Sequence, residues 1–178
     1  MSIIIDGGQS VAWITGILVI QMFDINHELI SEWNAWDHLD ISQYTNLNLE
    51  SNAIAWMHGN SIEWDGNNQI LVSNRASNEI LKVDLQSGEV LWHIGGPLNQ
   101  FTFINDPKQG FRMQHDVRRL ENGNISLFDN GVTPFLELLN IKLMKKRKLQ
   151  SWYGNIYTQT ALWDLVWEVS KDYPTIIP

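Results

Sequence analysis

Short runs of alternating apolar and polar residues, separated by turn-forming residues, follow one another through most of the chain. Residues 56–94 contain four such runs, HGNSIEW, QILVSNR, EILKVD and EVLWHI. The turns between them include Asp65-Gly66 and Ser87-Gly88, and glycine supplies the positive φ that hairpin turns require. The pattern therefore predicts an antiparallel meander of four strands.

The same pattern recurs in two less complete copies on either side of this unit. Residues 17–33, ILVIQMFDINHELISEW, match its last two strands, including the tryptophan at the end. A third copy begins near residue 114, with outer strands expected over residues 135–143 and 161–169. Repetition of a four-stranded unit predicts an all-β protein, a β-propeller of four-stranded antiparallel blades.

The copies predict a single partial propeller domain over residues 1–178. Residues 1–50 would form the end of one blade and a connection, residues 51–112 a complete blade, and residues 113–178 a further blade with a divergent C-terminal part. Only about two and a half to three blades are present, whereas propellers close with roughly four to eight. We therefore expect a propeller fragment, or a chain that self-associates to complete the propeller. A β-sandwich built from the same strands is the alternative fold.

Two histidines stand at one position of two successive copies. From Met57 the chain reads MHGNSIEWDGNNQILVSN, and from Gln114 it reads QHDVRRLENGNISLFDN, so His58 and His115 each open a unit. A polar residue repeated at one point of successive blades is directed towards a shared axis. The repeat therefore predicts a central site that both imidazoles face.

Composition narrows the classes of partner and chemistry. The formal net charge is −8, and no Lys or Arg precedes Arg75, which argues against a nucleic acid partner. The basic run at residues 145–148 is short and isolated, which favours a solvated hairpin. The absence of cysteine excludes a disulfide, a thiolate zinc site and a cysteine nucleophile. The apolar stretch at residues 11–20 is too short for a membrane span and predicts a buried strand.

The residues best suited to chemistry at the shared axis are His58, Asn60, Arg75, Gln114 and His115. Arg75 ends the second strand of the blade that His58 begins, so hairpin pairing is expected to return it to the level of that histidine. A guanidinium offers forked donors to sulfate or phosphate oxygens, and a neutral imidazole attacks electrophiles or shuttles protons. This set therefore indicates a site for a tetrahedral oxyanion. An ordinary structural role is the alternative for each residue.

Five segments occur in order over residues 14–131: WNAWDHLDI, HGNSIEWDGNNQILVSNR, KVDLQSGEVLWHIGG, FTFINDP and QHDVRRLENGNISLFDNG. Together they resemble the arylsulfotransferase family, the PAPS-independent aryl-sulfate sulfotransferases. The resemblance implies a six-bladed propeller that transfers a sulfuryl group from an aryl sulfate to a phenol without a cofactor. The match fades beyond residue 131, and the upstream blades usual in the family are not seen here.

The resemblance also implies roles for individual residues. The histidine of the family's QHD motif corresponds to His115, which would be the nucleophile that forms a transient sulfohistidine. The histidine of the HxNS motif corresponds to His58, and the arginine of the SxR motif to Arg75. Both would bind sulfuryl oxygens and stabilise developing charge.

The residues expected to bind substrate are Asn60, Gln114, His38, Trp36 and Trp56. His38 resembles a further family position, and the two tryptophans are expected near the channel mouth, where they would stack on the aryl ring. The chain has nine tryptophans, so packing between blades is the alternative role for each of them. The expected partners are a small aryl sulfate donor and a phenolic acceptor.

Two other functions are compatible with the sequence. One is a non-catalytic or inactive propeller fragment that acts as a binding or interaction module, because so few blades are present. The other is a phosphatase-like or metal-dependent hydrolase, with His58, His115 and Asp116 as metal ligands. These three residues form no compact ligand motif, so we expect no metal. The family resemblance implies a periplasmic or secreted protein, although the chain shows no signal-peptide pattern.

Overall fold

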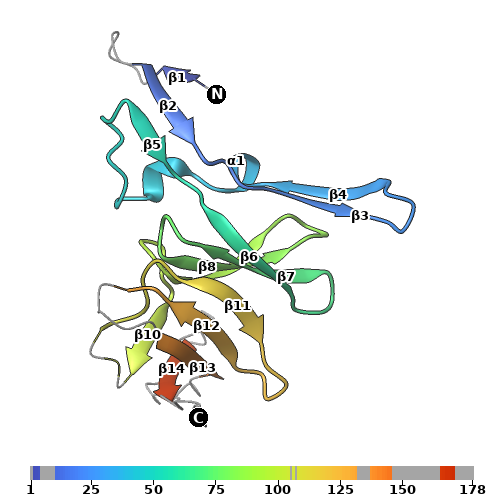
Figure 1. Cartoon of the computed structure of the whole chain (residues 1–178), viewed down its shortest axis with the longest axis vertical. Helices are drawn as coiled ribbons and strands as arrows, with labels where there is room; N and C mark the ends of the chain where they lie inside the picture. Colours follow the sequence, from blue (N-terminus) through green and yellow to red (C-terminus); the bar gives the residue numbers. More distant parts are fainter. Residues whose placement is uncertain are drawn as a thin grey trace, which may run out of the picture.

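The computed structural model describes residues 2–4, 11–104, 106, 108–131, 137–145 and 165–170. Its strands form four sheets, with the orders β1-β2-β5, β3-β4, β6-β7-β8-β9 and β10-β14-β13-β12-β11. The sheets follow one another down the molecule, from the N-terminal strands in blue to the C-terminal strand in red (Figure 1). The protein is thus nearly all β, with four-stranded antiparallel units that match the prediction of partial propeller blades.

The central sheet is the four-stranded meander predicted from the sequence. Its strands are β6 (Gly59–Trp64), β7 (Gln69–Asn74), β8 (Glu79–Asp84) and β9 (Val90–Gly95), each antiparallel to the next. Gly66 and Gly88 lie in its turns with φ of 75° and 79°, the conformation expected for them. The register pairs Gly59 with Asn74, so the end of β7 lies opposite the start of β6.

The C-terminal sheet combines four antiparallel strands with one parallel strand. The antiparallel strands are β11 (His115–Arg119), β12 (Ile125–Asp129), β13 (Glu137–Lys145) and β14 (Leu165–Ser170). The two predicted outer strands are therefore confirmed, with shifted ends. The sequence pattern does not predict β10 (Phe101–Ile104), which pairs in parallel with β14 and covers its edge. The hairpin expected for the basic run lies, apart from residue 145, outside the described residues.

The N-terminal part forms two smaller sheets. In one, β3 (Val19–Phe23) pairs with β4 (Leu29–Asn34), as the pattern over residues 17–33 predicts. The other contains β1 (Ser2–Ile4), β2 (Val11–Thr15) and β5 (Ala53–Ala55). The prediction of a single strand over residues 11–20 is wrong, because Gly16, with φ of 75°, separates β2 from β3. The chain passes close to itself there, and a Cβ on Gly16 would lie 2.1 Å from Met57 O.

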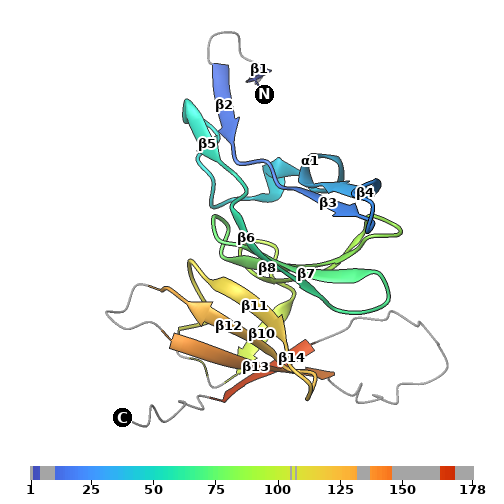
Figure 2. The same cartoon turned by 45° about the vertical axis from the view of Figure 1, so that its right-hand side comes forward.

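The central sheet is covered on both faces. Alternate residues along its strands belong to two different hydrophobic clusters, one on each face. Val72 packs in a cluster with the N-terminal part, while the adjacent Leu71 packs in a cluster with Val117 of the C-terminal sheet. Successive residues of a strand point to opposite faces, so a slip of one residue would exchange the two clusters. This packing holds β11 beside β6 and β7 (Figure 2).

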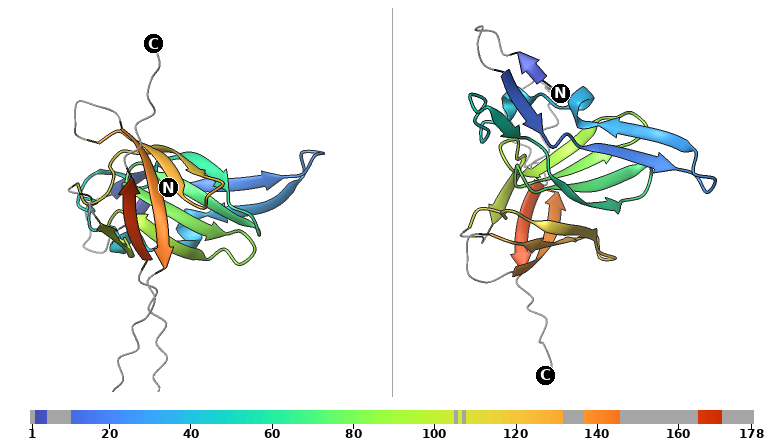
Figure 3. Two further views of the ribbon diagram at one scale, coloured as in Figure 1. Left: turned by 90° about the horizontal axis from the view of Figure 1, so that it is seen from below. Right: turned by 45° about the horizontal axis from the view of Figure 1, so that its top comes forward.

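A short connection leads from β4 to β5 and contains the helix α1 (Ala35–His38) and the 3₁₀ turn η1 (Ile41–Gln43). The described helices are all too short to cross a membrane. Trp33, at the end of β4, is buried, and its indole N–H donates to Gly88 O at 2.9 Å. The rest of the β3–β4 hairpin projects from the side of the molecule (Figure 3). Trp33 therefore has the packing role considered for tryptophans in the sequence.

Candidate active site

A row of hydrogen bonds joins β6 of the central sheet to β11 of the C-terminal sheet. Asn60 Nδ2 donates to Gln114 O at 2.7 Å, and Val117 N–H donates to Ser61 Oγ at 2.9 Å. We call these contacts the β6–β11 row. They hold the two strands side by side, so the two histidines at their starts lie at the same end of the row.

His58 and Arg75 lie opposite each other at the open end of the β6–β7 hairpin. Arg75 N–H donates to His58 O at 2.9 Å, so the hairpin returns the arginine to the level of the histidine. Asn74, the last residue of β7, adds a second hydrogen bond at this point, because its Oδ1 accepts from His58 N–H at 2.8 Å. His58 is exposed and Arg75 is partly buried. Within the described part of the chain, neither the imidazole nor the guanidinium has a hydrogen bond or ion pair.

Asn60 occupies a β-bulge at the start of β6. The register between β6 and β7 shifts between Gly59 and Ser61, which leaves Asn60 without a partner residue in β7. Its Nδ2 group donates to Gln114 O in the β6–β11 row, and its Oδ1 is buried without a hydrogen bond to any described residue. Bulges commonly redirect a side chain beside a functional site. Here the bulge directs Asn60 towards the neighbouring sheet.

Gln114 is wholly buried, which differs from the substrate-binding role predicted for it. Its Nε2 donates to Asn74 O at 3.1 Å, Glu79 O at 2.9 Å and Ser73 Oγ at 3.2 Å. The side chain has no exposed surface, and its role in substrate binding stays a prediction. Gln114 fastens the start of β11 to the end of β7, and so fixes the backbone immediately before His115.

His115 is partly buried at the first position of β11, and its ring is held by a neighbour. Its Nδ1 lies 2.8 Å from Nδ2 of Asn130, the residue after β12. Met113 and Asp116, which flank the Gln114-His115 pair, have φ of 52° and 56°. Positive φ is uncommon and costly for residues other than glycine, and such strain clusters at functional sites. The start of β11 is therefore an irregular segment that orients one imidazole.

The carboxylate of Asp116 forms an ion pair with Arg118. Its Oδ1 lies 2.5 Å from Nη2 of Arg118. The described residues contain no group of three or more His, Asp or Glu side chains arranged to hold a metal ion. The arrangement at the start of β11 thus consists of an imidazole, an amide and, across the row, a guanidinium.

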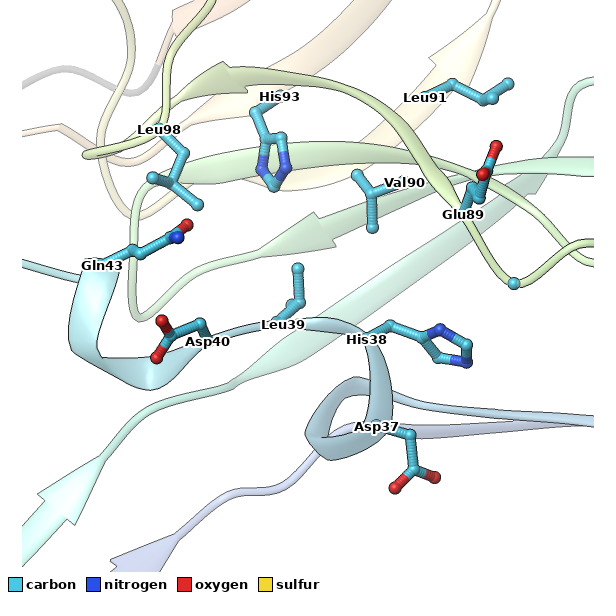
Figure 4. Close-up of a pocket in the computed structure, with 11 residues that line it drawn as sticks. Asp37, His38, Leu39, Asp40, Gln43, Glu89, Val90, Leu91, His93 and Leu98 are labelled. Atoms are coloured by element: carbon cyan, nitrogen blue, oxygen red, sulfur yellow. The ribbon is translucent and has the colours of Figure 1, made fainter.

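His38 lies apart from these residues. It is exposed at the end of α1 and stacks on Trp33, with ring centroids 5.5 Å apart and an interplanar angle of 6°. It lines an open pocket of about 650 Å³ between the α1–η1 connection and β9 (Figure 4). Neither His58, Arg75 nor His115 is among the residues that line this pocket. The structure therefore does not bring His38 together with the repeated histidines.

Trp56 and Trp36 pack against each other rather than around an open channel. Their ring centroids lie 5.6 Å apart in an edge-to-face contact, and Tyr44 makes a similar contact with Trp56 at 5.7 Å. Trp56 is completely buried, so it offers no face to an aryl ring in this structure. Trp36 is partly buried in the same cluster.

A buried carboxylate lies behind the candidate site, and the sequence analysis missed it. Glu79 is wholly buried, with Oε1 2.7 Å from His93 Nδ1 and Oε2 accepting from Ser77 Oγ at 2.9 Å. Tyr44 O–H also donates to Oε2, at 3.3 Å. Burial, reinforced by the charge of Glu79, raises the pKa of the Tyr44 hydroxyl. The signal in the sequence is a glutamate at a buried position of the strand EILKVD, although its partners come from distant segments.

Asn130 is the second residue that the sequence analysis missed as part of the site. The signal was present, because Asn130 and Asn74 hold the same position in the two copies of the repeat. The contact with His115 depends on the pairing of β11 with β12, in which His115 lies opposite Phe128. Sequence spacing alone does not specify that register.

A family model described as arylsulfotransferase (ASST) matches residues 18–175 of the chain. The match includes the β3–β4 pair, the whole central sheet and the strands of the C-terminal sheet. No curated protein matches the chain.

Proposed function

This chain belongs to the arylsulfotransferase family, and we propose that it transfers a sulfuryl group from an aryl sulfate to a phenolic acceptor through a sulfohistidine at His115, without PAPS. The observation that carries the proposal is the position of Arg75. Its guanidinium has no partner among the described residues, and its backbone is bonded to His58 at the end of the β6–β11 row where His115 lies.

Arg75 and His58 suit the binding of a sulfuryl group. A guanidinium presents planar, forked donors that match two oxygens of a tetrahedral oxyanion. Such donors stabilise the transition state most when they are oriented before the reaction begins. Arg75 meets this condition in part, because the β6–β7 hairpin fixes its backbone. We assign Arg75 to the sulfuryl oxygens and His58 to proton transfer beside them.

The first half-reaction forms the covalent intermediate. A nitrogen lone pair of His115 attacks the sulfur of the aryl sulfate, and an N–S bond forms. The bond between sulfur and the aryl oxygen breaks, and its electron pair leaves on the phenoxide. His58, protonated at the start, donates a proton to this phenoxide.

The second half-reaction returns the enzyme to its starting state. His58, now neutral, accepts the proton of the phenolic acceptor as its oxygen attacks the sulfur. A new S–O bond forms, and the electron pair of the N–S bond returns to the ring of His115. Each half-reaction therefore needs one nucleophile and one proton carrier, and no external cofactor.

Initial-rate kinetics test the proposal. The purified chain is assayed with a chromogenic aryl sulfate at several fixed concentrations of a phenolic acceptor. A sulfohistidine intermediate requires the first phenol to leave before the acceptor reacts, so double-reciprocal plots should be parallel. Transfer with intersecting lines would overturn the covalent intermediate, and the absence of transfer would overturn the activity of this chain.

A second candidate function is a non-catalytic interaction module. It is supported by β3, which pairs with β4 and with no other strand among the described residues. An unpaired strand edge is a template for association with another chain. Light scattering coupled to size exclusion distinguishes the candidates when it is combined with the assay. A single chain without turnover favours the module, whereas sulfuryl transfer favours the enzyme.

A further inference from the structure

The side chain of Asn130 makes one hydrogen bond within the described part of the chain, and that bond is to the ring of His115. The two nitrogen atoms, Asn130 Nδ2 and His115 Nδ1, lie 2.8 Å apart. Asp129 anchors the turn beside it, with Oδ1 accepting from Gly131 N–H at 2.9 Å and from Arg112 N–H at 2.9 Å. The backbone that carries Asn130 is therefore fixed, and its amide is aimed at one ring nitrogen.

A contact at Nδ1 determines what Nε2 can do. A neutral imidazole carries one proton, so Nε2 has a free lone pair only when the proton is on Nδ1. A group that faces a protonated Nδ1 must accept a hydrogen bond. The amide of Asn130 offers an acceptor, Oδ1, and a donor, Nδ2, and a half-turn of the amide exchanges them at nearly the same position.

We infer that Asn130 is a positioning residue for His115: its Oδ1 holds the proton on Nδ1 and leaves the lone pair of Nε2 to attack the sulfur. The catalytic consequence of this inference rests on the proposed function. In the structure Nδ2 faces Nδ1, and this orientation places the proton on Nε2 and gives a ring that cannot attack through that atom. A half-turn of the amide brings Oδ1 to Nδ1 without moving the backbone, and this is the orientation that we assign to the reactive enzyme. Orientation of a histidine by a partner at its other nitrogen is a general way to fix its tautomer.

The same contact supports the intermediate. When Nε2 forms its bond to sulfur, the electron pair of the broken S–O bond leaves with the phenoxide, and the ring keeps its proton on Nδ1. The ring then carries positive charge, which strengthens the hydrogen bond from Nδ1–H to Asn130 Oδ1. In the second half-reaction the N–S electron pair returns to Nε2, and the proton on Nδ1 has not moved.

Only in the second copy of the repeat does the asparagine contact the ring of the histidine. Asn74 accepts from the backbone N–H of His58, not from its ring, and its Nδ2 lies 2.5 Å from Ser77 Oγ. Asn74 is also wholly buried, whereas Asn130 is partly exposed. One copy therefore uses the position to fix a strand end, and the other uses it to orient a ring.

The ring tautomer can be measured without any assay of activity. Nitrogen-15 NMR of the full chain with labelled histidine distinguishes a protonated from an unprotonated ring nitrogen. Three variants are compared with the wild type: Asn130→Ala removes the contact, Asn130→Asp offers only acceptors, and Asn122→Ala alters an exposed turn asparagine as a control. We expect the population with the proton on Nδ1 to fall in Asn130→Ala, and to be kept or increased in Asn130→Asp. Equal populations in the wild type and Asn130→Ala would overturn the inference.

Turnover provides the second readout. We expect Asn130→Ala to lose about 10- to 100-fold in kcat, as is usual when the partner that orients a histidine is removed, with KM little changed. Asn130→Asp should restore most of this loss, which a merely structural role would not explain. Unchanged kcat in Asn130→Ala would overturn the contribution of this positioning to turnover. If the wild type itself transfers no sulfuryl group, the proposed function fails, and the NMR result alone decides the positioning role. If Asn130→Ala does not fold, Asn130→Asp decides, because a population with the proton on Nδ1 that is smaller than in the wild type would overturn the inference.

Discussion

The two copies of the histidine repeat place an asparagine at the same position and use it differently. In the first copy, Asn74 Oδ1 accepts from the backbone N–H of His58 at 2.8 Å. In the second, the Asn130 amide contacts the ring of His115 at 2.8 Å. One histidine therefore has a fixed backbone and an exposed ring, whereas the other has an oriented ring. An oriented ring suits a nucleophile, and a ring with freedom to move suits a proton carrier.

Neighbouring residues explain why the two asparagines differ. In the buried turn after β7, Ser77 Oγ accepts from Asn74 Nδ2, so both ends of that amide are used within the first copy. After β12, Asp129 Oδ1 binds the backbone of Gly131 and stabilises the turn in place of the asparagine. The amide of Asn130 is then available for the ring. The two copies thus share the same strand pattern, but the residues of their turns determine whether the asparagine binds the backbone or the ring of the histidine.

Replacing each of the two histidines in turn should have the largest effects on turnover, and the two effects should differ. We expect His115→Ala to lower turnover by roughly 10³-fold or more, because the nucleophile is lost. His58→Ala should lower it by about 10²-fold, the contribution of one proton carrier. His27, exposed in the β3–β4 turn, supplies the matched control His27→Asn, which should leave turnover unchanged. Equal losses at His58 and His115 would contradict unequal roles.

Arg75 should show the next largest effect. Arg75→Ala removes the guanidinium proposed to bind the sulfuryl oxygens, and we expect kcat to fall by about 10²- to 10³-fold. Arg75→Lys keeps the charge without the forked donors, so it should recover only part of the loss. Steady-state assays with a chromogenic aryl sulfate measure both variants. An Arg75→Ala protein with wild-type kcat would remove this residue from the site.

The two asparagines should also differ in their effect on stability. Asn74→Ala leaves buried partners without hydrogen bonds, and we expect the free energy of unfolding to fall by about 1 to 3 kcal/mol. Asn130→Ala should cost less than about 1 kcal/mol, because the residue is partly exposed and its contact is to a ring that is itself only partly buried. Urea unfolding monitored by tryptophan fluorescence gives both values. A larger loss in Asn130→Ala would reverse the assignment of structural and orienting roles.

The smallest expected effect concerns Asp65 at the far end of the row, where its ion pair with Arg119 joins the two copies. Asp65 is nearly buried, with Lys82 Nζ at 2.7 Å and Arg119 Nη2 at 2.8 Å. Burial opposes its ionisation, but hydrogen bonds from Arg119 and Lys82 outweigh this and hold the pKa of the Asp65 carboxyl below its ordinary value of 3.8. The ionised group therefore stabilises the fold above that value, and the contribution is lost as pH falls through the lowered pKa.

Unfolding at a series of pH values tests this contribution. The wild type should lose more stability than Asp65→Asn as the pH is lowered from about 6 to about 2, since only the wild type has this carboxylate to protonate. Parallel pH profiles for the two proteins would show that the ionised Asp65 carboxylate does not stabilise the fold.

The central sheet could be predicted because its signals are local. Asp65-Gly66 and Ser87-Gly88 mark turns, and the runs between them alternate with period two. The break at Gly16 could not be predicted, because it depends on the close approach of Met57 from 41 residues away in sequence. The parallel strand β10 was missed for the same reason, since its partner β14 is far along the chain.

Prediction of the candidate site was similarly divided between local and distant contacts. The return of Arg75 to the level of His58 follows from one hairpin, and it appears in the structure. The burial of Gln114 and the contact between Asn130 and His115 follow from the packing of β11 against β6 and β7 and from its register with β12. No spacing in the sequence specifies those contacts.

The most direct test of the different roles of His115 and His58 is to find which of them carries the sulfuryl group. The purified chain is incubated with an aryl sulfate carrying ³⁵S and no acceptor, digested under alkaline conditions that preserve a sulfohistidine, and mapped by mass spectrometry. We predict label on the peptide that contains His115, none on the peptide that contains His58, and loss of the label when a phenol is added. Label on His58, or turnover without label on His115, would contradict the assignment.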